Sequence, residues 1–172
     1  TTAATQGTID NATSNNLDGS TVADATTALG LTGDIVINGK SVTLKSTDTL
    51  NDVVAKINNL SADTRVDASV TISASSKAGL VLKTTGYGSD DTVQVSGDNA
   101  TLRKLGLAAS GDNVSTVISK AGSDAVATLD YQDGTSIAVA DVDGNKVTFE
   151  NGLTVQGIDG TVANGDTTTV IV

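Results

Sequence analysis

The chain of 172 residues contains no His, Cys, Met, Trp or Pro. Without His and Cys, a Ser-His-Asp triad, a Cys-His dyad, a zinc–thiolate site and a disulfide are excluded, and the commonest general acid–base group is missing. Twenty acidic against ten basic residues give a net charge of −10. This charge disfavours binding to nucleic acid and to an anionic membrane surface.

Hydrophobic residues are abundant enough for a core, but almost none of them is aromatic. They make up 38% of the chain, whereas Phe and Tyr together contribute 2%. We therefore expect a folded protein with a thin, sheet-rich core of small aliphatic side chains. No apolar run approaches the roughly 20 residues of a membrane-spanning helix. Because the chain does not begin with Met, we expect it to be a piece of a longer protein.

The first clear structural signals lie between residues 7 and 44. The first 30 residues are rich in Thr, Ser, Asn and Ala, and one strand is expected there, at Gly7–Ile9. The apolar runs Asp34–Ile37 and Val42–Leu44 flank the dipeptide Asn38-Gly39. This dipeptide favours the positive φ angles of a tight turn, so the segment predicts a β-hairpin.

A helix is predicted to begin after Thr49. The sequence Thr49–Asp52 fits the Ser/Thr-x-x-acid pattern of a capping box. The hydroxyl can accept a hydrogen bond from an otherwise unpaired amide, and Asp52 lies where the helix dipole favours negative charge. The apolar residues that follow have helical spacing and form one stripe. These residues are Leu50, Val53, Val54 and Ile57.

Strand patterns continue to residue 107. Alternation of apolar and polar residues predicts a strand with one buried face. That face consists of Val66, Ala68, Val70 and Ile72. Leu80–Leu82 and Val93–Val95 predict two more strands, and Thr101–Leu105 predicts one helical turn that ends at a left-handed Gly106.

The last third of the chain predicts a meander of short antiparallel strands, because Asx-Gly turns are frequent there. The predicted strands are Ala125–Tyr131, Ile137–Val142, Val147–Phe149, Leu153–Val155 and Thr168–Val172. The turns are Asp133-Gly134, Asp143-Gly144, Asn151-Gly152, Asp159-Gly160 and Asn164-Gly165. Residues 108–122 are expected to form the seam between two modules.

One segment resembles the opening of a calcium loop. It is Asp141–Asn145, in which two aspartates precede a glycine. The calcium pattern requires Gly where Lys146 stands and a bidentate acid where Gly152 stands. A hairpin turn is the favoured interpretation.

The remaining charged candidates are interpreted as surface groups. Asp90-Asp91 and the pair Asp63 and Asp67 are interpreted as solvated carboxylates, because no partner or cleft for a general acid is indicated. Lys56 and Lys104 are interpreted as helix-surface cations. We expect no catalytic, cofactor-binding or metal-binding residues.

Two further features leave alternatives open. Tyr87 is either an exposed loop contact or a lid on the small core, and the lid is favoured. The pattern Asn-x-Ser/Thr arises by chance in a chain of this composition and is left unassigned. It occurs at Asn11, Asn59, Asn99 and Asn113.

The block Gly33–Leu107 resembles the IN module of bacterial flagellins and flagellar hook-associated proteins. The motifs that carry the resemblance occur in the order of that family. They are Ile37-Asn38-Gly39, Thr49-Leu50, Ile57-Asn58, Val66–Val70, Gly79–Leu82 and Thr85-Gly86. Leu102–Leu107 is similar to the segment that follows this module in several axial proteins.

A second likeness lies near the C-terminal end. Gly152–Gly157 followed by Ala163–Thr167 looks like the strand-turn-strand exit of hook-filament junction proteins and some flagellins. Val162 stands where that family often has Pro. The expected fold is mainly β with one or two short helices (α+β), in two small antiparallel lobes. The resemblance implies an inner domain of residues 1–32 with 108–172, and an inserted IN-like domain of residues 33–107.

The resemblance implies a structural, extracellular part of the bacterial flagellum, the outer variable domains of a flagellin. Copies would then assemble into a helical filament through long helices that this chain does not show, with no nucleic acid, membrane or cofactor as partner. A hook-filament junction protein or a filament cap protein is the alternative within the family. A surface adhesin is the rival class, although only Tyr87 and Tyr131 could form an aromatic binding site. An enzyme ranks third.

Overall fold

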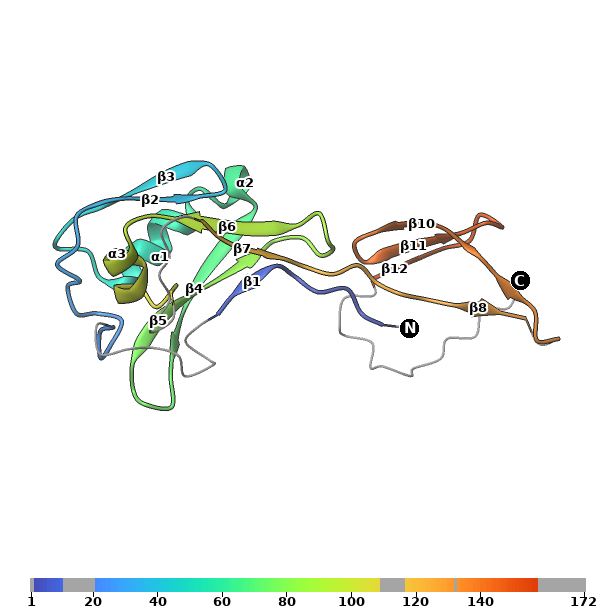
Figure 1. The fold of residues 1–172 in the computed structure, drawn as a ribbon, viewed down its shortest axis with the longest axis horizontal. Coiled ribbons are helices and arrows are strands. Elements are labelled where there is room, and N and C mark those ends of the chain that lie inside the picture. The colour runs from blue at the N-terminus through green and yellow to red at the C-terminus, as the bar shows by residue number, and fades with distance from the viewer. Residues whose placement is uncertain (1, 11–20, 109–116, 132, 158–172) are drawn as a thin grey trace. The chain divides into compact units, whose positions relative to one another are not determined.

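A computed structural model of the chain describes residues 2–10, 21–108, 117–131 and 133–157 (Figure 1). The described part is mainly β, with several small antiparallel sheets and short helices, which confirms the predicted fold class. Its contacts form two compact units. The large unit comprises Thr8–Thr85 and Thr92–Lys120, and the small unit comprises Thr1–Gly7, Gly86–Asp91 and Ala121–Val172. The domains 1–32 with 108–172 and 33–107 stay a prediction.

The main sheet of the large unit begins with the predicted hairpin. Strand β2 is Gly33–Ile37 and strand β3 is Lys40–Leu44, paired so that Ile37 lies opposite Lys40. Asn38 and Gly39 form the turn with φ angles of 44° and 81°. Both angles are positive, as a two-residue hairpin turn with right-handed strand twist requires.

Helix α1, Leu50–Asn58, begins as predicted after Thr49. The Asp52 N–H donates to the Thr49 hydroxyl, and the Thr49 N–H donates to the Asp52 carboxylate, which completes the capping box. Leu50, Val53 and Ile57 are buried, and Val54 is half-buried. A second short helix, α2 (Ser61–Thr64), follows and was not predicted.

The second sheet of the large unit has the order β1-β5-β4. Its strands are β1 (Thr8–Ile9), β4 (Val66–Ile72) and β5 (Ala78–Thr84). The expected burial along β4 is correct for Val66 and Ala68 but wrong for Ile72, which is 56% exposed. The reason is that α1 packs on the first half of β4, and the β4–β5 hairpin extends past the helix (Figure 1).

The main sheet is completed in the order β3-β2-β6-β7. Strand β6 is Thr92–Ser96, and β7 is Val117–Ala121. Part of the predicted seam over residues 108–122 forms β7 of this sheet, and the boundary between the two units lies in the same stretch, after Lys120. Helix α3, Asn99–Lys104, lies between the two strands, and Gly106 has a φ of 74°, as predicted for the helix end.

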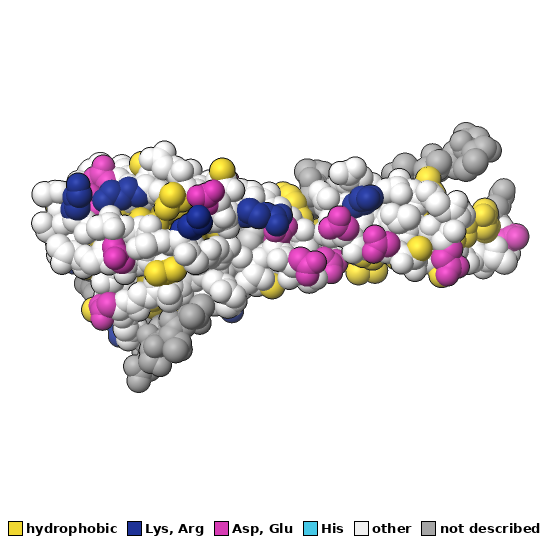
Figure 2. Space-filling model, turned by 90° about the horizontal axis from the view of Figure 1, so that it is seen from above, with side chains coloured by type: hydrophobic (Ala, Val, Ile, Leu, Met, Phe, Trp, Pro, Cys, Tyr) yellow, Lys and Arg dark blue, Asp and Glu magenta, His cyan; other side chains and the backbone are white. Residues whose placement is uncertain are grey.

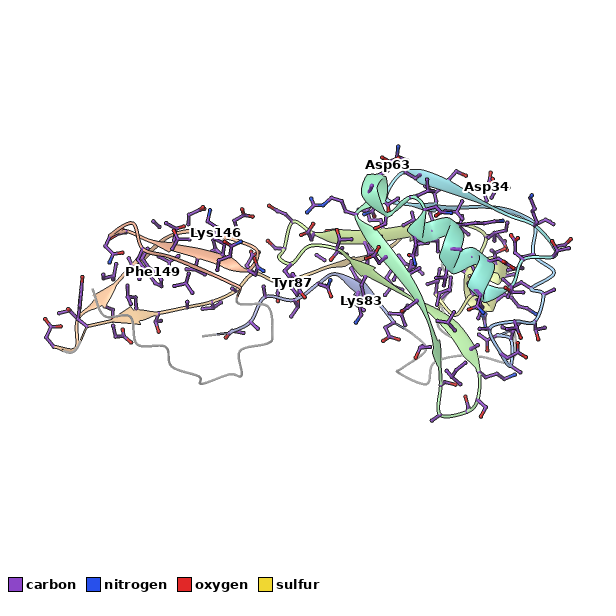
Figure 3. The ribbon with its side chains drawn as sticks, turned by 180° about the vertical axis from the view of Figure 1, so that it is seen from behind. Asp34, Asp63, Lys83, Tyr87, Lys146 and Phe149 are labelled. Carbon is purple, nitrogen blue, oxygen red and sulfur yellow. The ribbon has the colours of Figure 1, made fainter. Side chains whose placement is uncertain are left out.

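The small unit contains five short strands in its described part. They are β8 (Leu129–Asp130), β9 (Ser136–Ile137), β10 (Val139–Asp143), β11 (Lys146–Phe149) and β12 (Thr154–Gln156). Three form a sheet in the order β10-β11-β12, and β8 pairs with β9. The core consists of Ala4, Ala125, Ala127, Val147 and Phe149. Figure 3 labels Phe149 among the side chains of this unit.

Two strand predictions in this unit need correction. The predicted strand 125–131 is shorter, because Val126 forms only a single bridge, with Thr2, before β8 begins. The predicted strand 137–142 is divided after Ile137, because β9 pairs with β8 whereas β10 pairs with β11. The predicted strand 168–172 and the turns at 159–160 and 164–165 lie outside the described residues.

Candidate functional site

The large unit contains two Ile-Asn dipeptides, and both place the isoleucine in the core. Ile37 ends β2 and Ile57 lies in the last turn of α1, and neither side chain is exposed. The asparagine that follows each isoleucine leaves the core and uses its carboxamide to bind backbone groups. We name these two side chains, Asn38 and Asn58, the asparagine latches.

The first latch extends a strand beyond its last residue. The Asn38 backbone N–H donates to Gln94 O at 3.0 Å, and the Asn38 side-chain oxygen accepts from the Gln94 N–H at 2.7 Å. In a regular strand the Asn38 backbone carbonyl would accept this bond from Gln94, but it turns into the hairpin. The side-chain oxygen therefore accepts the bond in its place. Its amide nitrogen donates to Thr64 O at 2.8 Å and to Thr92 O at 2.9 Å, so one carboxamide joins β2, β6 and α2.

The second latch occupies the edge of a sheet. The Asn58 side-chain oxygen accepts from the Ala68 N–H at 2.7 Å, and its nitrogen donates to Ala68 O at 3.1 Å. Ala68 pairs with Leu82 of β5 on its other side, and β4 is an outer strand among the described strands of this sheet. The carboxamide therefore takes the place of a neighbouring strand, which ties α1 to β4 and covers the edge at that point.

A half-buried ion pair lies beside the hairpin of the first latch. The ammonium group of Lys56 binds the carboxylate of Asp48, which is 7% exposed, and donates to Thr43 O at 2.9 Å. Burial raises the pKa of Asp48, but the hydrogen bonds from Lys56 and from the Lys45 N–H outweigh it, so that the pKa lies below its usual value. The interpretation of Lys56 as an ordinary surface cation misses this pair, because Asp48 precedes the helix.

The small unit contains a close crossing of backbones at three glycines, which the sequence analysis missed. A Cβ on Gly122 would overlap Thr5 O, one on Gly144 would overlap Tyr87 O, and one on Gly88 would lie 2.6 Å from Gly144 Cα. No larger residue fits these positions without a shift of backbone. The crossing therefore fixes three distant segments of the chain against one another.

A carboxylate stabilises one of the segments that meet at this crossing. Asp124 accepts hydrogen bonds from the Ser89 N–H at 2.8 Å and from the Ser89 hydroxyl at 2.7 Å. The backbone bond and then the hydroxyl bond lower the pKa of Asp124, because both favour the charged carboxylate. These groups have structural partners and do not form an acid–base pair.

The predicted calcium-like segment forms a hairpin in the structure. Asp143 pairs with Lys146 across a turn of two residues, Gly144 and Asn145, so the favoured interpretation is confirmed. Asp141 and Asp143 lie in an extended strand rather than around a loop. No group of three or more Asp or Glu that could hold a metal ion occurs within the described ranges.

The two acidic pairs do not form a common site. Asp63 forms an exposed ion pair with Lys40 at 3.3 Å, and Asp67 accepts a hydrogen bond from the Ser61 hydroxyl. Of the pair Asp90-Asp91, the first is exposed and the second is buried.

The remaining candidate residues pack against a core or lie at the surface. Tyr87 packs against the core of the small unit, which confirms the predicted lid. Lys104 is half-buried at the end of α3, Asn59 is exposed and Asn99 is half-buried. Asn11 and Asn113 lie outside the described residues.

The segment that holds both latches matches a known motif. The model of the flagellin hook IN motif matches residues 30–86, which include Asn38 and Asn58. The matched segment, about a third of the chain, carries this motif of flagellins and hook proteins. The predicted resemblance to the IN module is confirmed.

Other comparisons add two findings. Among solved structures, the D2–D3 domains of the flagellar cap protein FliD from Escherichia coli are similar, with a TM-score of 0.46 and 18% sequence identity. The similarity covers 96% of this chain and 73% of that chain. No curated protein sequence matches this one. Within the described part of the chain, every helix is too short or too polar to cross a membrane.

Proposed function

We propose that this chain is the outer, variable part of a flagellin, displayed on the surface of the extracellular flagellar filament. The observation that carries the proposal is the IN motif over residues 30–86, in which both asparagine latches are formed. Copies of the protein assemble through helical segments outside this chain, and the two units described above project from the polymer. The function is mechanical and protective, and it needs no reactive centre.

A lobe displayed on a polymer must not pair its strand edges with neighbouring copies, and the latches meet this requirement. Many copies stand close together on a polymer, so an open strand edge is a place where a neighbour could add a strand. Asn58 covers the edge of β4 at Ala68 with a side chain of the same lobe. Asn38 fixes the end of β2 to β6 and thereby keeps the hairpin in one register.

The groups that an enzyme would use support the same proposal. With no His or Cys in the chain, acid–base chemistry would depend on carboxylates, Lys or Tyr. Asp48, Asp124 and Asp133 each accept hydrogen bonds that lower the pKa, whereas a general acid near neutral pH needs a raised one. We therefore propose that the chain has no catalytic activity.

Immunogold electron microscopy tests the location. Antibodies raised against the purified 172-residue chain are applied to intact flagellated cells of the source organism, and the gold positions are recorded along each flagellum. We expect gold along the whole filament. Cells from which the gene has been deleted provide the control and should carry no gold.

Each other pattern of labelling contradicts the proposal in a defined way. Gold only at the distal tip would identify a cap protein, and gold only where hook and filament meet would identify a junction protein. Gold on the cell body, with unlabelled flagella, would identify a surface adhesin.

A further inference from the structure

The net charge of the chain is concentrated in one of its two units. The large unit contains nine Lys or Arg and ten Asp, a net charge of −1. The small unit contains one cation, Lys146, and ten Asp or Glu, a net charge of −9. A field of this sign attracts basic partners and raises their rate of encounter.

The small unit also exposes most of the large apolar side chains at the surface. Val126, Tyr131, Val139 and Val142 are between 38% and 59% exposed, and they are four of the five such residues in the described part of the chain. Figure 2 shows hydrophobic side chains beside acidic ones on the molecular surface. Apolar groups next to charge of one sign are typical of a surface that binds a partner.

Strand β10 combines these features with an outer edge that pairs with no other described strand. It is the outer strand of the β10-β11-β12 sheet among the described strands, and every residue in it is exposed. The two-residue turn makes Asp143 and Lys146 a hydrogen-bonded pair, so Val142 opposite Val147 is a pair without mutual hydrogen bonds. The N–H and C=O of Val142 therefore point away from β11, towards the open side of the sheet.

A bulge brings two valines of β10 to the same face. Ala140 is the extra residue, so Val139 lies opposite Phe149 and Val142 lies opposite Val147. Phe149 and Val147 are 2% and 0% exposed, whereas Val139 and Val142 are 40% and 38% exposed. The apolar face of the sheet thus continues past the core to its open edge.

We propose that the β10 edge docks a basic, extended segment of a partner protein, in which Lys or Arg alternates with aliphatic residues. The segment adds a strand beside β10 by bonding the outward backbone groups of Val142. Its aliphatic side chains cover Val139 and Val142, and its cations lie beside Asp141 and Asp143. This inference goes beyond the structural role of the chain and does not depend on its position in the flagellum.

A second copy of the chain is a poor occupant of the same edge. Two β10 strands side by side would place Asp141 and Asp143 of one copy next to the same residues of the other. Like charges that face each other across strands are destabilising, and both small units carry a net charge of −9. Attraction between opposite charges therefore favours a basic segment, and repulsion between like charges disfavours the pairing of two copies.

A peptide-binding experiment with the whole chain tests the proposal. The probe is a fluorescein-labelled peptide of eight residues in which Lys and Val alternate, and binding is followed by fluorescence anisotropy. A second peptide has Pro in place of its two central Val residues, which keeps the charge but removes two backbone donors. We expect the first peptide to bind at least about fivefold more tightly than the second, because strand addition needs those donors.

Two double variants of equal charge locate the binding edge. Asp141→Asn with Asp143→Asn should weaken binding of the first peptide by about fivefold, because both neighbouring carboxylates are lost. Asp90→Asn with Glu150→Gln removes two exposed charges from the same unit and should change binding less than twofold. Hydrogen exchange should show slower exchange at Val142 when the peptide is bound.

Three results would overturn the proposal. One is equal binding of the two peptides, since this would indicate attraction by charge alone. Another is equal weakening by both double variants. The third is sedimentation of the unmodified chain as a dimer that Asp141→Lys disrupts, because the edge would then serve self-association.

Discussion

Replacing Asn58 by Ala removes the latch on β4 while leaving the fold of α1 intact. The change deletes two hydrogen bonds to Ala68, of 2.7 and 3.1 Å, worth about 1 kcal/mol each in net terms. Ala is a better helix former than Asn by about 0.6 kcal/mol, which offsets part of the loss. We expect the free energy of unfolding of the large unit to fall by about 1.4 kcal/mol, and its Tm to fall by about 6 °C.

Urea unfolding followed by far-UV circular dichroism measures this loss. Both tyrosines, Tyr87 and Tyr131, lie in the small unit, so tyrosine fluorescence follows that unit separately and should be unchanged. Asn59→Ala is the matched control, because Asn59 is the exposed next residue and the substitution should alter the free energy of unfolding by less than about 0.5 kcal/mol. Equal effects of the two substitutions would refute the latch.

Three further predictions concern the other features. Asn38→Asp keeps the acceptor for Gln94 but removes the donors to Thr64 O and Thr92 O, and should destabilise the large unit by about 2 kcal/mol in urea unfolding. Asn151→Asp, at an exposed Asn-Gly turn where only the side-chain acceptor is used, should be nearly neutral. Gly144→Ala should lower the unfolding midpoint seen by tyrosine fluorescence by more than Gly152→Ala does, because an added methyl group meets Tyr87 O only at Gly144; equal shifts would contradict the tight crossing. Asp48 has a lowered pKa in the folded state, so its stabilising effect is complete above the unfolded pKa of about 3.9 and is lost as the pH falls through the folded value. The unfolding free energy of Asp48→Asn should therefore fall less than that of the unmodified chain between pH 5 and pH 2, and parallel pH profiles would contradict this.

The sequence alone predicts those elements whose start or end is determined by residues close together in the chain. Thr49 and Asp52 specify the start of α1 through contacts three residues apart, and Asn38-Gly39 specifies the hairpin through its own φ angles. Both features depend on neighbours in the chain rather than on the tertiary fold. The same holds for Gly106 at the end of α3.

The functional contacts of the latches could not be predicted in this way. Asn38 binds Gln94, 56 residues away in the sequence, and the identity of Gln94 is immaterial because the bonds use its backbone. In the sequence, Asn58 stands out only as part of the Ile57-Asn58 motif, which does not indicate a bond to β4. Its partner is again a backbone group, that of Ala68. Side chains that bind backbone leave no complementary residue for a sequence pattern to show.

The glycine crossing and the β10 bulge escaped prediction for a related reason. Gly122 and Gly144 are indistinguishable from turn glycines until the segments that approach them, around Thr5 and Tyr87, are placed. A regular strand over residues 137–142 would place Val139 and Val142 on opposite faces. The bulge at Ala140 puts both valines on the apolar face.

Cryo-electron microscopy of native flagella tests the central claim most directly, because it shows where the large unit with its two asparagine latches lies. A helical reconstruction of filaments from cells that express the protein should contain density for the large unit on the outer surface of every subunit. Within that density, α1 should pack on β4 with the Asn58 side chain against Ala68. A filament without this density, or a lobe with the β4 edge paired to a neighbouring copy, would contradict the account.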